Sequence, residues 1–435
     1  MRALLLLGIM VVLVPLAFFA PFTGLLTFLW MALVRPHEWA YQGAARYSLA
    51  VGVATLAGYL IFELPRRSPK LLSNWVLILL WVQLLLSTLI ADSAGETQAK
   101  FMEYSKIFVI TVLVTAMTDS ESRVWWMLLV TLGSVGFLAF RANFGIVVSG
   151  GTARIFGPGG AIGDNNDFAV MLDMALPMMI YFGRGEPRRW LRLGFYAMAA
   201  MTVITIIFTY SRGGFLGLCV VALVLAFKTR YKLTGLLGVM IISLLLFAVV
   251  PRDIVDRMSS IRTARETDTS AQQRIRAWTV SLKIIRDYPV FGVGIRNITQ
   301  VWARYGDPED ARVSHNSLLQ LGTDAGLPAV CLFLTALGLT YWRLRKGRKL
   351  LQMFAPDSRL IIYTYGLQVG MIGYLVAAMF ASRYDLELLY EVIALAASIV
   401  LIARRYEREA EVSQLVKAAA PPLAPAPVAV NQWSL

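Results

Sequence analysis

The sequence is poor in the residues that form disulfides or bind metals. Among its 435 residues are only two cysteines, Cys219 and Cys331, and two histidines, His37 and His315. Both cysteines lie within apolar runs, so neither a disulfide framework nor a zinc site with paired cysteines can form. We therefore expect no metal and no other cofactor.

Charged residues are scarce as well, and 27 acidic residues stand against 41 basic ones. They make up 16% of the chain while 57% is hydrophobic, a balance typical of an integral membrane protein. The excess positive charge lies in short loops between apolar runs, for example at 184–192, 228–232 and 343–349. This pattern predicts that the loops are cytoplasmic, and we expect no nucleic-acid partner.

Long apolar runs predict an all-α integral membrane protein with about 12 transmembrane helices, each needing about 20 apolar residues. The first 34 residues, interrupted by Pro15 and Pro21, are interpreted as one broken, uncleaved membrane anchor. If Pro21 turned a hairpin instead, there would be thirteen spans and the N-terminus would lie outside. The other predicted spans are 47–64, 72–91, 103–118, 124–149, 167–183, 193–209, 213–227, 233–250, 314–342, 359–380 and 386–403.

These spans divide the chain into four parts. Residues 1–250 and 314–403 are predicted to form an N-terminal and a C-terminal bundle of transmembrane helices. Residues 251–313 form the longest hydrophilic segment, which we expect to fold as a large helical loop outside the membrane. It carries 11 Lys and Arg against 8 Asp and Glu, which favours an anionic ligand. Residues 404–435 are predicted to be a disordered cytoplasmic tail, because the chain ends in a Pro/Ala-rich stretch.

The first candidate site residue is Arg212, in "IIFTYSRGGFLGLCV" (206–220). It stands between two apolar spans with only Ser211 and Gly213 beside it, where the chain has to reverse at the membrane edge. An arginine at such a place is costly and marks a functional site by default. A buried anion site is our first interpretation, and an arginine that extends to the lipid headgroups is the second.

The second candidate is "QQRIRAWTVSL", which contains Arg274, Arg276 and Trp278. On a helix, Arg274 and Trp278 share a face because they are four residues apart, while Arg276 points elsewhere. The spacing alone is also typical of an ordinary solvated amphipathic helix.

The third candidate is His315 in "VSHNSLLQLGTDAGLPAV" (313–330). If Ser314 is the N-cap, His315 lies in the first turn of a transmembrane helix, where the helix dipole disfavours its protonated form. A neutral imidazole there can accept a proton near neutral pH. The alternative is a hydrogen-bonded interfacial histidine, and His37 in "VRPHEW" is interpreted as structural.

Taken together, these segments resemble the O-antigen ligase superfamily, which includes O-antigen ligases, O-antigen polymerases and related O-glycosylation ligases of the bacterial envelope. The resemblance runs from about residue 150 to 345. The N-terminal third, with "RPHEW", is similar to exosortase-associated O-glycosylation ligases. The segments that carry the resemblance are "GDNNDFAVMLDMALPM", "SRGGFLG", "RIRAW", "YPVFGVGIRN" and "SHNSLLQLGTDAGLPA", in this order.

The resemblance implies a GT-C-like glycosyltransferase in the bacterial inner membrane, with its active site facing the periplasm. The implied donor is a glycan on undecaprenyl diphosphate, and the implied acceptor is a hydroxyl of lipid A-core. The family's two functional arginines correspond to Arg212 and Arg274, with Arg276 as the fallback, and its histidine to His315. Guanidinium groups bind phosphate oxygens bidentately, so we expect metal-independent transfer with inversion at the anomeric carbon.

Several further residues are expected near this site. Asn166 begins a middle span, and Arg383 and Asp385 follow the last outer turn and can line the site. Asp385 and Glu387 diverge on a helix and would clamp a metal poorly. Asp324, beside the predicted helix break at Gly326–Pro328, is interpreted first as a polar packing residue and second as a catalytic one. The alternative functions are O-antigen polymerisation, protein O-glycosylation and, in another class, transport of a lipid-linked oligosaccharide.

Overall fold

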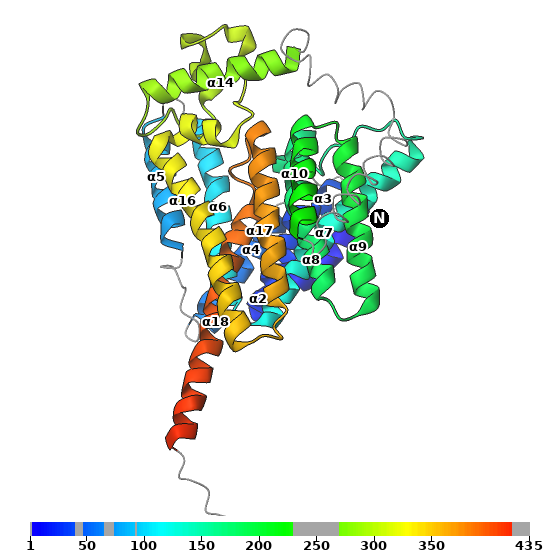
Figure 1. Ribbon diagram of the computed structural model, residues 1–435. Coiled ribbons are helices and arrows are strands. Elements are labelled where there is room, and N and C mark those ends of the chain that lie inside the picture. The colour runs from blue at the N-terminus through cyan, green and yellow to red at the C-terminus, as the bar shows by residue number, and fades with distance from the viewer. Residues whose placement is uncertain (1, 40–46, 65–73, 92–93, 229–268, 420–435) are drawn as a thin grey trace, which may run out of the picture.

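The computed structural model describes residues 2–39, 47–64, 74–91, 94–228 and 269–419, and every regular element in these ranges is helical (Figure 1). Their apolar composition identifies a multi-pass membrane protein. Among the described residues, five helices are long and apolar enough to cross a bilayer: Arg2–Phe19 (α1), Glu121–Val148 (α7), Arg189–Phe208 (α9), Ser317–Phe354 (α16) and Leu360–Phe380 (α17 with η6). Shorter apolar helices are Pro21–Val34 (α2), Tyr47–Glu63 (α4 with η1) and Trp75–Leu89 (α5).

The first 34 residues form a hairpin, so the prediction of one broken span is wrong. α1 and α2 meet at Pro21 and pack side by side, because Met10 and Met31 belong to one buried cluster with Val51 of α4. Proline is well placed at the first position of α2, where no backbone N–H is needed. The expected total of twelve spans is not confirmed, and the predicted span 233–250 lies outside the described residues.

The centre of the molecule is α8 (Asn165–Gly185), which packs against α9, α10 (Arg212–Lys228) and α17. The glycines of "SRGGFLG" allow a close approach. A Cβ atom on Gly213 would lie 2.5 Å from Cβ of Phe380, and one on Gly214 would lie 2.5 Å from Cβ of Ala169. The motif therefore brings the start of α10 against the start of α8 and the end of α17.

A second, smaller core lies at one end of the bundle, which we call the α14 end (Figure 1). There α14 (Thr269–Asp287), α15 (Ile298–Val301), η4 (Trp302–Arg304) and η5 (Pro308–Asp310) form a helical unit. Its core holds Ala277, Ile284 and Trp302. Residues 251–268 of the predicted loop lie outside the described residues.

α16 is kinked at Gly326, which has non-helical angles and precedes Pro328. The loop after α14 binds the polar groups that the kink leaves open. The N–H of Val293 donates to the carbonyl of Thr323 at 2.8 Å, and the N–H of Leu327 donates to the carbonyl of Pro289 at 2.7 Å. The helical unit is thereby fixed to the bundle at the helix break.

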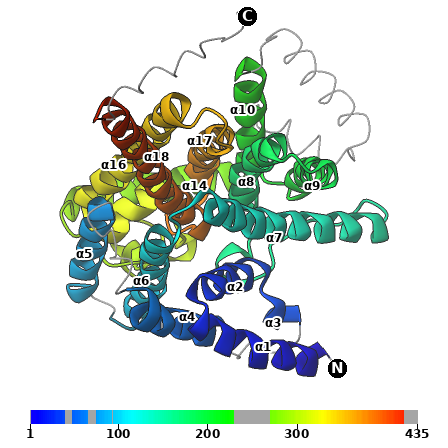
Figure 2. The same ribbon diagram turned by 90° about the horizontal axis from the view of Figure 1, so that it is seen from below.

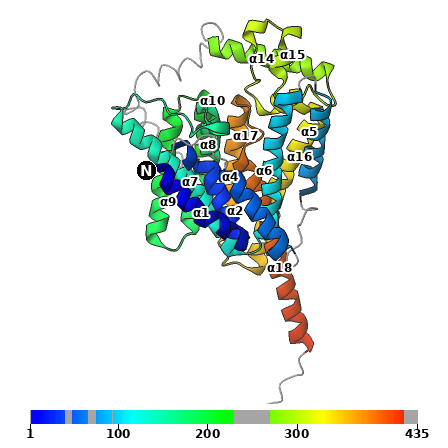
Figure 3. The same cartoon turned by 180° about the vertical axis from the view of Figure 1, so that it is seen from behind.

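The opposite end, the α18 end, carries the predicted inner loop at 184–192, whereas the predicted loop at 343–349 is wrong because these residues are part of α16. The α8–α9 and α16–α17 connections lie there, as does the far part of α18 (Glu387–Ala419) (Figures 1 and 3). The prediction of disorder from residue 404 is wrong for residues 404–419, which continue α18. Arg405 and Glu409 are spaced to pair along the helix, and the Tyr406 hydroxyl donates to Glu121 of α7 at 2.9 Å.

Seen from below, α2, α4 and α6 (Ala94–Met117) form a group beside the central helices (Figure 2). α2 and α4 are neighbours through Gly24 and Thr55, and α18 packs along both α6 and α16. Most predicted spans match helices to within a few residues at each end. The exceptions are α6, which begins at Ala94 rather than residue 103, and α16 and α18, which run past their predicted ends.

Candidate active site

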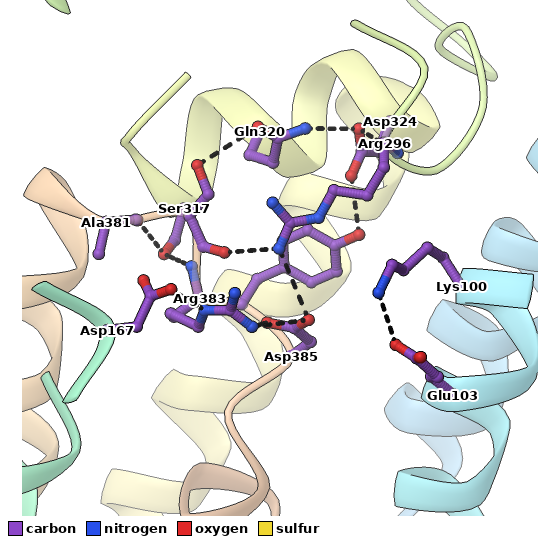
Figure 4. A network of polar contacts seen from close by, with 12 residues as sticks. Lys100, Glu103, Asp167, Arg296, Ser317, Gln320, Asp324, Ala381, Arg383 and Asp385 are labelled. Carbon is purple, nitrogen blue, oxygen red and sulfur yellow. Dashed lines mark hydrogen bonds and ion pairs between the residues drawn. The ribbon is translucent and has the colours of Figure 1, made fainter. Parts of the chain in front are cut away.

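The connection between α17 and α18, residues 381–386, is the centre of a buried polar network (Figure 4). Arg383 bridges two acids: its Nε lies 2.9 Å from Asp167 of α8 and its Nη1 lies 3.3 Å from Asp385. The backbone N–H of Arg383 also donates to the Ser317 hydroxyl at 2.9 Å. The Arg383 side chain is 13% exposed, and these contacts fix the connection against α8 and α16.

Arg296, in the loop that docks on the α16 break, enters the same network. Its backbone has a left-handed φ of 63°, and its N–H donates to Asp324 Oδ1 at 3.1 Å. Its guanidinium donates to the carbonyl of Ser382 at 3.0 Å and lies 3.7 Å from Asp385. A non-glycine residue in this conformation is costly and is kept where its surroundings require it. The loop therefore holds Arg296 in one position.

Asp324 connects the two halves of the network. It is fully buried and accepts hydrogen bonds from Gln320 Nε2 and from the Tyr384 hydroxyl, both at 2.8 Å, besides that from Arg296. Gln320 in turn accepts from the backbone N–H of Ser314 at 3.1 Å. Asp324 thus links α16 to the loop of Arg296 and to Tyr384.

The charges in the connection compensate one another. Burial raises the pKa of Asp385, but Arg383 and Arg296 outweigh burial and hold that pKa below its ordinary value. Burial lowers the pKa of Arg296, whereas Asp385 and its neighbours raise it above the ordinary value. Both groups are therefore ionised at neutral pH. Asp385 is occupied by two arginines instead of pairing with Glu387 as a metal clamp.

His315 lies at the start of α16 but outside its first turn. Asn316 is the N-cap, because its side chain accepts from the N–H groups of Leu318 and Leu319. The predicted N-cap at Ser314 is thus wrong. Of the polar residues in "SHNS", it is Asn316 that stands directly before the first helical residue. His315 itself has a left-handed φ of 48°, in the tight turn that precedes the helix.

The surroundings of His315 favour its neutral form. Burial lowers the pKa of the imidazole most, and Arg274 lowers it further, while Asp164 raises it. Arg312 and Arg296 also lower it. A pKa below the ordinary 6.5 leaves the imidazole uncharged at neutral pH and able to accept a proton.

The structure separates the two candidate arginines of α14. Arg274 and Trp278 lie on the same face of α14. The Trp278 Nε1 donates to the carbonyl of Ser314 at 3.0 Å. The positive charge of Arg274 lowers the pKa of His315. Arg276 is 62% exposed and pairs with Asp310 at 2.7 Å. Of the two arginines, Arg274 is thus the one near His315, whereas the fallback residue Arg276 is exposed on the helical unit.

Arg212 begins α10 and Asn166 lies in the first turn of α8, and both helix starts lie at the α14 end. Ser211 caps α10, since its hydroxyl accepts from the N–H of Gly214 at 3.1 Å and donates to Asn166 Oδ1 at 2.8 Å. Asp164 caps α8 by accepting from the N–H of Asn166 at 2.8 Å. Arg212 is the first residue of α10 and is half-buried. Two positive helix ends thus flank it, an arrangement that attracts anions.

Sequence reasoning missed four residues of the network: Asp167, Arg296, Gln320 and Tyr384. Arg296 could have been noticed, because a charged residue in the glycine-containing segment "YPVFGVGIRN" must have a partner when that loop is buried. Asp167 directly follows Asn166 in a segment that we singled out. Within the described ranges, no group of three or more His, Cys, Asp or Glu side chains has the geometry of a metal site.

Comparison with known families supports the resemblance. Residues 196–334 match a family described as O-Antigen ligase, which confirms the similarity to the O-antigen ligase superfamily over that stretch. Residues 1–166 match a family of unknown function (DUF5935). A comparison with curated proteins gave no match. Arg212, Arg274, Arg296, His315 and Asp324 all fall within the O-antigen ligase match, whereas Asn166, Arg383 and Asp385 lie outside it.

Proposed function

We propose that the protein is an O-antigen ligase-type glycosyltransferase. It transfers a glycan from undecaprenyl diphosphate to a sugar hydroxyl of lipid A-core on the periplasmic side of the inner membrane. The observation that supports this proposal best is the position of His315, a half-buried histidine in the field of Arg274 and beside the capped start of α8. The site combines a proton acceptor with fixed positive charge, which transfer from a diphosphate requires.

In the proposed step, the acceptor oxygen attacks the anomeric carbon while the bond from that carbon to the diphosphate oxygen breaks. His315 takes the hydroxyl proton, and the electron pair of the broken bond stays on the diphosphate. Arg212 and Arg274 stabilise the charge that develops there, because guanidinium groups form paired hydrogen bonds with phosphate oxygens. Attack from the face opposite the leaving group inverts the anomeric carbon.

The two ends of the bundle support the proposed sidedness. The basic stretches 184–192 and 343–349 lie at or near the α8–α9 and α16–α17 connections, at the α18 end, and such basic stretches stay in the cytoplasm (Figure 1). His315, Arg274 and the starts of α8 and α10 lie at the α14 end. The α14 end then faces the periplasm, where a lipid-linked glycan meets its acceptor.

Two related activities share this chemistry and differ only in the acceptor. Transfer to a protein or to a growing glycan would use the same donor, leaving group and base. Lipopolysaccharide from a strain that lacks the gene separates the three activities. Loss of a ligase leaves lipid A-core without glycan, loss of a polymerase leaves single repeats on the core, and loss of a protein ligase leaves the banding unchanged.

The direct test uses the purified full-length chain with an undecaprenyl-diphosphate glycan and an acceptor. We expect release of undecaprenyl diphosphate, at the same rate in excess chelator. Arg212→Lys should lose most of this activity although charge is retained, because an ammonium group cannot reproduce the planar fork. Movement of the intact donor across the membrane without cleavage would identify a transporter, and full activity of the lysine variant would remove Arg212 from the diphosphate site.

A further inference from the structure

A large cavity lies between the N-terminal helices and the polar network. Its volume is about 930 Å³, at the upper end of ordinary ligand pockets. Its walls come mainly from α2, α4 and α6, which lie within the match to the family of unknown function, and from the start of α18. Apolar side chains that line it include Phe28, Ala32, Leu49, Val53, Leu56, Ile110 and Val114.

The cavity is amphipathic. Apolar side chains form most of its walls, and its charged lining is mixed. Arg35, Lys100, Arg296 and Arg383 stand among its basic residues, and Glu103, Asp385, Glu387 and Glu391 are its acidic ones. Figure 4 shows Lys100 on α6 facing the group of Arg296 and Asp385, with its Nζ 2.8 Å from Glu103. Arg296, Arg383 and Lys100 are each paired with one of these acids. The anionic end of a molecule with a long apolar chain is therefore suited to Arg35 and His37 instead.

Arg35 is held toward the cavity by strained backbone. It caps α2 with a left-handed φ of 52°, and its nearest acid, Glu38, is 3.8 Å away. Its guanidinium lies against Gly160 of η3 (Gly160–Ile162), where a Cβ atom would overlap it. The position of the Arg35 guanidinium thus depends on Gly160, which lies between α7 and α8. The contact between Arg35 and Gly160 is not needed to cap α2.

His37 of α3 (Pro36–Trp39) supplies an independent sign of a ligand. Its side chain lines the cavity and the residue is 7% exposed. Its Nδ1 has no hydrogen-bond partner among the residues that the structure describes, and its Nε2 lies 4.0 Å from Glu38. A buried polar nitrogen without a partner is unfavourable, so a bound group that pairs with it would remove that cost.

We propose that this cavity binds the isoprenoid chain of an anionic lipid and that Arg35 and His37 contact its phosphate. A guanidinium group matches phosphate geometry, and an imidazole nitrogen can donate to a phosphate oxygen. The identification of this lipid as the glycan donor rests on the proposed function. The isoprenoid chain of the donor would then lie against the N-terminal helices, beside Arg296 and Arg383.

The chain part of the proposal is tested by filling the cavity. Purified full-length protein is titrated with undecaprenyl phosphate as the probe, with undecaprenol, phosphatidylglycerol and inorganic phosphate as comparisons. Ala32→Phe adds a ring to the cavity wall, and Ala200→Phe adds one to an exposed face of α9. We expect Ala32→Phe to weaken undecaprenyl phosphate binding at least about tenfold and Ala200→Phe to leave it unchanged.

The headgroup part is tested by three substitutions, two of which have a matched control variant. Arg35→Gln should weaken binding of the phosphate but not of undecaprenol, whereas Arg286→Gln, on an 80% exposed side chain of α14, should change neither. His37→Phe keeps the buried ring, so it should lower affinity without lowering the unfolding temperature. Gly160→Ala should lower affinity through Arg35, whereas Gly150→Ala, also at positive φ but with nothing within 4 Å, should not.

Different results would overturn the inference. Unchanged undecaprenyl phosphate affinity in folded Ala32→Phe would show that the chain lies elsewhere. Equal affinity for phosphatidylglycerol, or for inorganic phosphate alone, would refute a site for an isoprenoid phosphate. Each of these outcomes leaves the proposed function standing if Arg212→Lys still abolishes transfer, so failure of the cavity and failure of the enzyme are distinguishable.

Discussion

Two charged regions near the same end of the bundle differ in how their charges are satisfied. In the connection between α17 and α18, Arg383 lies between Asp167 and Asp385, and Arg296 lies against Asp385 and a backbone carbonyl. At the cavity, the pairs of Arg35 and His37 with Glu38 are long, at 3.8 and 4.0 Å. In the first region each arginine has a close ionic partner in the protein, although Arg383 Nε makes no hydrogen bond. In the second region the pairs are longer, which leaves capacity for a bound group.

This difference indicates separate roles for the two regions. A buried network whose charged members are paired makes the structure rigid and fixes the positions of the elements around it. Here it joins the starts of α8 and α16 to the helix break in α16, and so it sets where His315 lies. Polar groups with weak partners contribute little to folding and gain their partners on binding. Substitutions in the two regions should therefore affect different measurements.

The largest effect is expected from Asp324→Ala in the first region. The change leaves the N–H of Arg296, the Tyr384 hydroxyl and the Gln320 amide without their acceptor, which should cost about 3–5 kcal/mol. We expect aggregation or a much lower unfolding temperature, measured by fluorescence-detected size exclusion after heating. Tyr384→Phe removes one hydrogen bond and should cost about 0.5–1.5 kcal/mol. Equal stability of both variants would show that Asp324 does not organise the network.

The second prediction compares the two arginines of α14. Arg274→Gln should weaken donor binding about 10- to 100-fold, since a hydrogen bond to a charged group contributes about 1.5–3 kcal/mol. Arg276→Gln should change it less than about twofold, because that side chain is exposed and its pair with Asp310 contributes little. Titration of the donor against both purified variants measures this difference. The reverse order of effects would assign the site to Arg276.

The smallest effect is a shift of the pH profile. Arg274, Arg312 and Arg296 lower the pKa of His315 while Asp164 raises it. Transfer should fall as pH drops through that pKa, because the protonated imidazole cannot accept a proton. Arg312→Gln removes a positive neighbour, so the pKa should rise and the acid limb of kcat/KM should move to higher pH. Asp164→Asn keeps an N-cap residue but removes a negative neighbour, so the limb should move to lower pH. Shifts in the same direction in both variants would show that the limb belongs to another group.

Much of the fold could be predicted from the sequence, because apolar length and basic loops report directly on spans and their ends. The helices from α7 to α10 begin and end within four residues of the predicted spans. The hairpin of α1 and α2 was the second of two interpretations of the sequence, because Pro21 is compatible with a kink as well as with a turn. Which of the two forms depends on packing against α4, which lies at a distance in the sequence.

The site was predicted in part, for a similar reason. His315, Arg212 and Arg274 stand out because each is unusual for its local segment. Arg296 and Asp167 are ordinary in their own segments and acquire a role only through Arg383, Asp385 and the helix break. The orphaned nitrogen of His37 could not be found without the structure, because a histidine between proline and glutamate gives no sign of burial.

The proton-accepting role of His315 is tested most directly by measuring donor binding and single-turnover transfer on one preparation of His315→Gln. Because general base catalysis contributes about 10²–10⁴-fold, transfer should fall by that factor. Donor affinity should stay close to that of the parent protein, since the arginines hold the diphosphate. A folded variant that transfers glycan at the parent rate would contradict the proposal. Loss of donor affinity in step with the rate would make His315 a phosphate ligand instead.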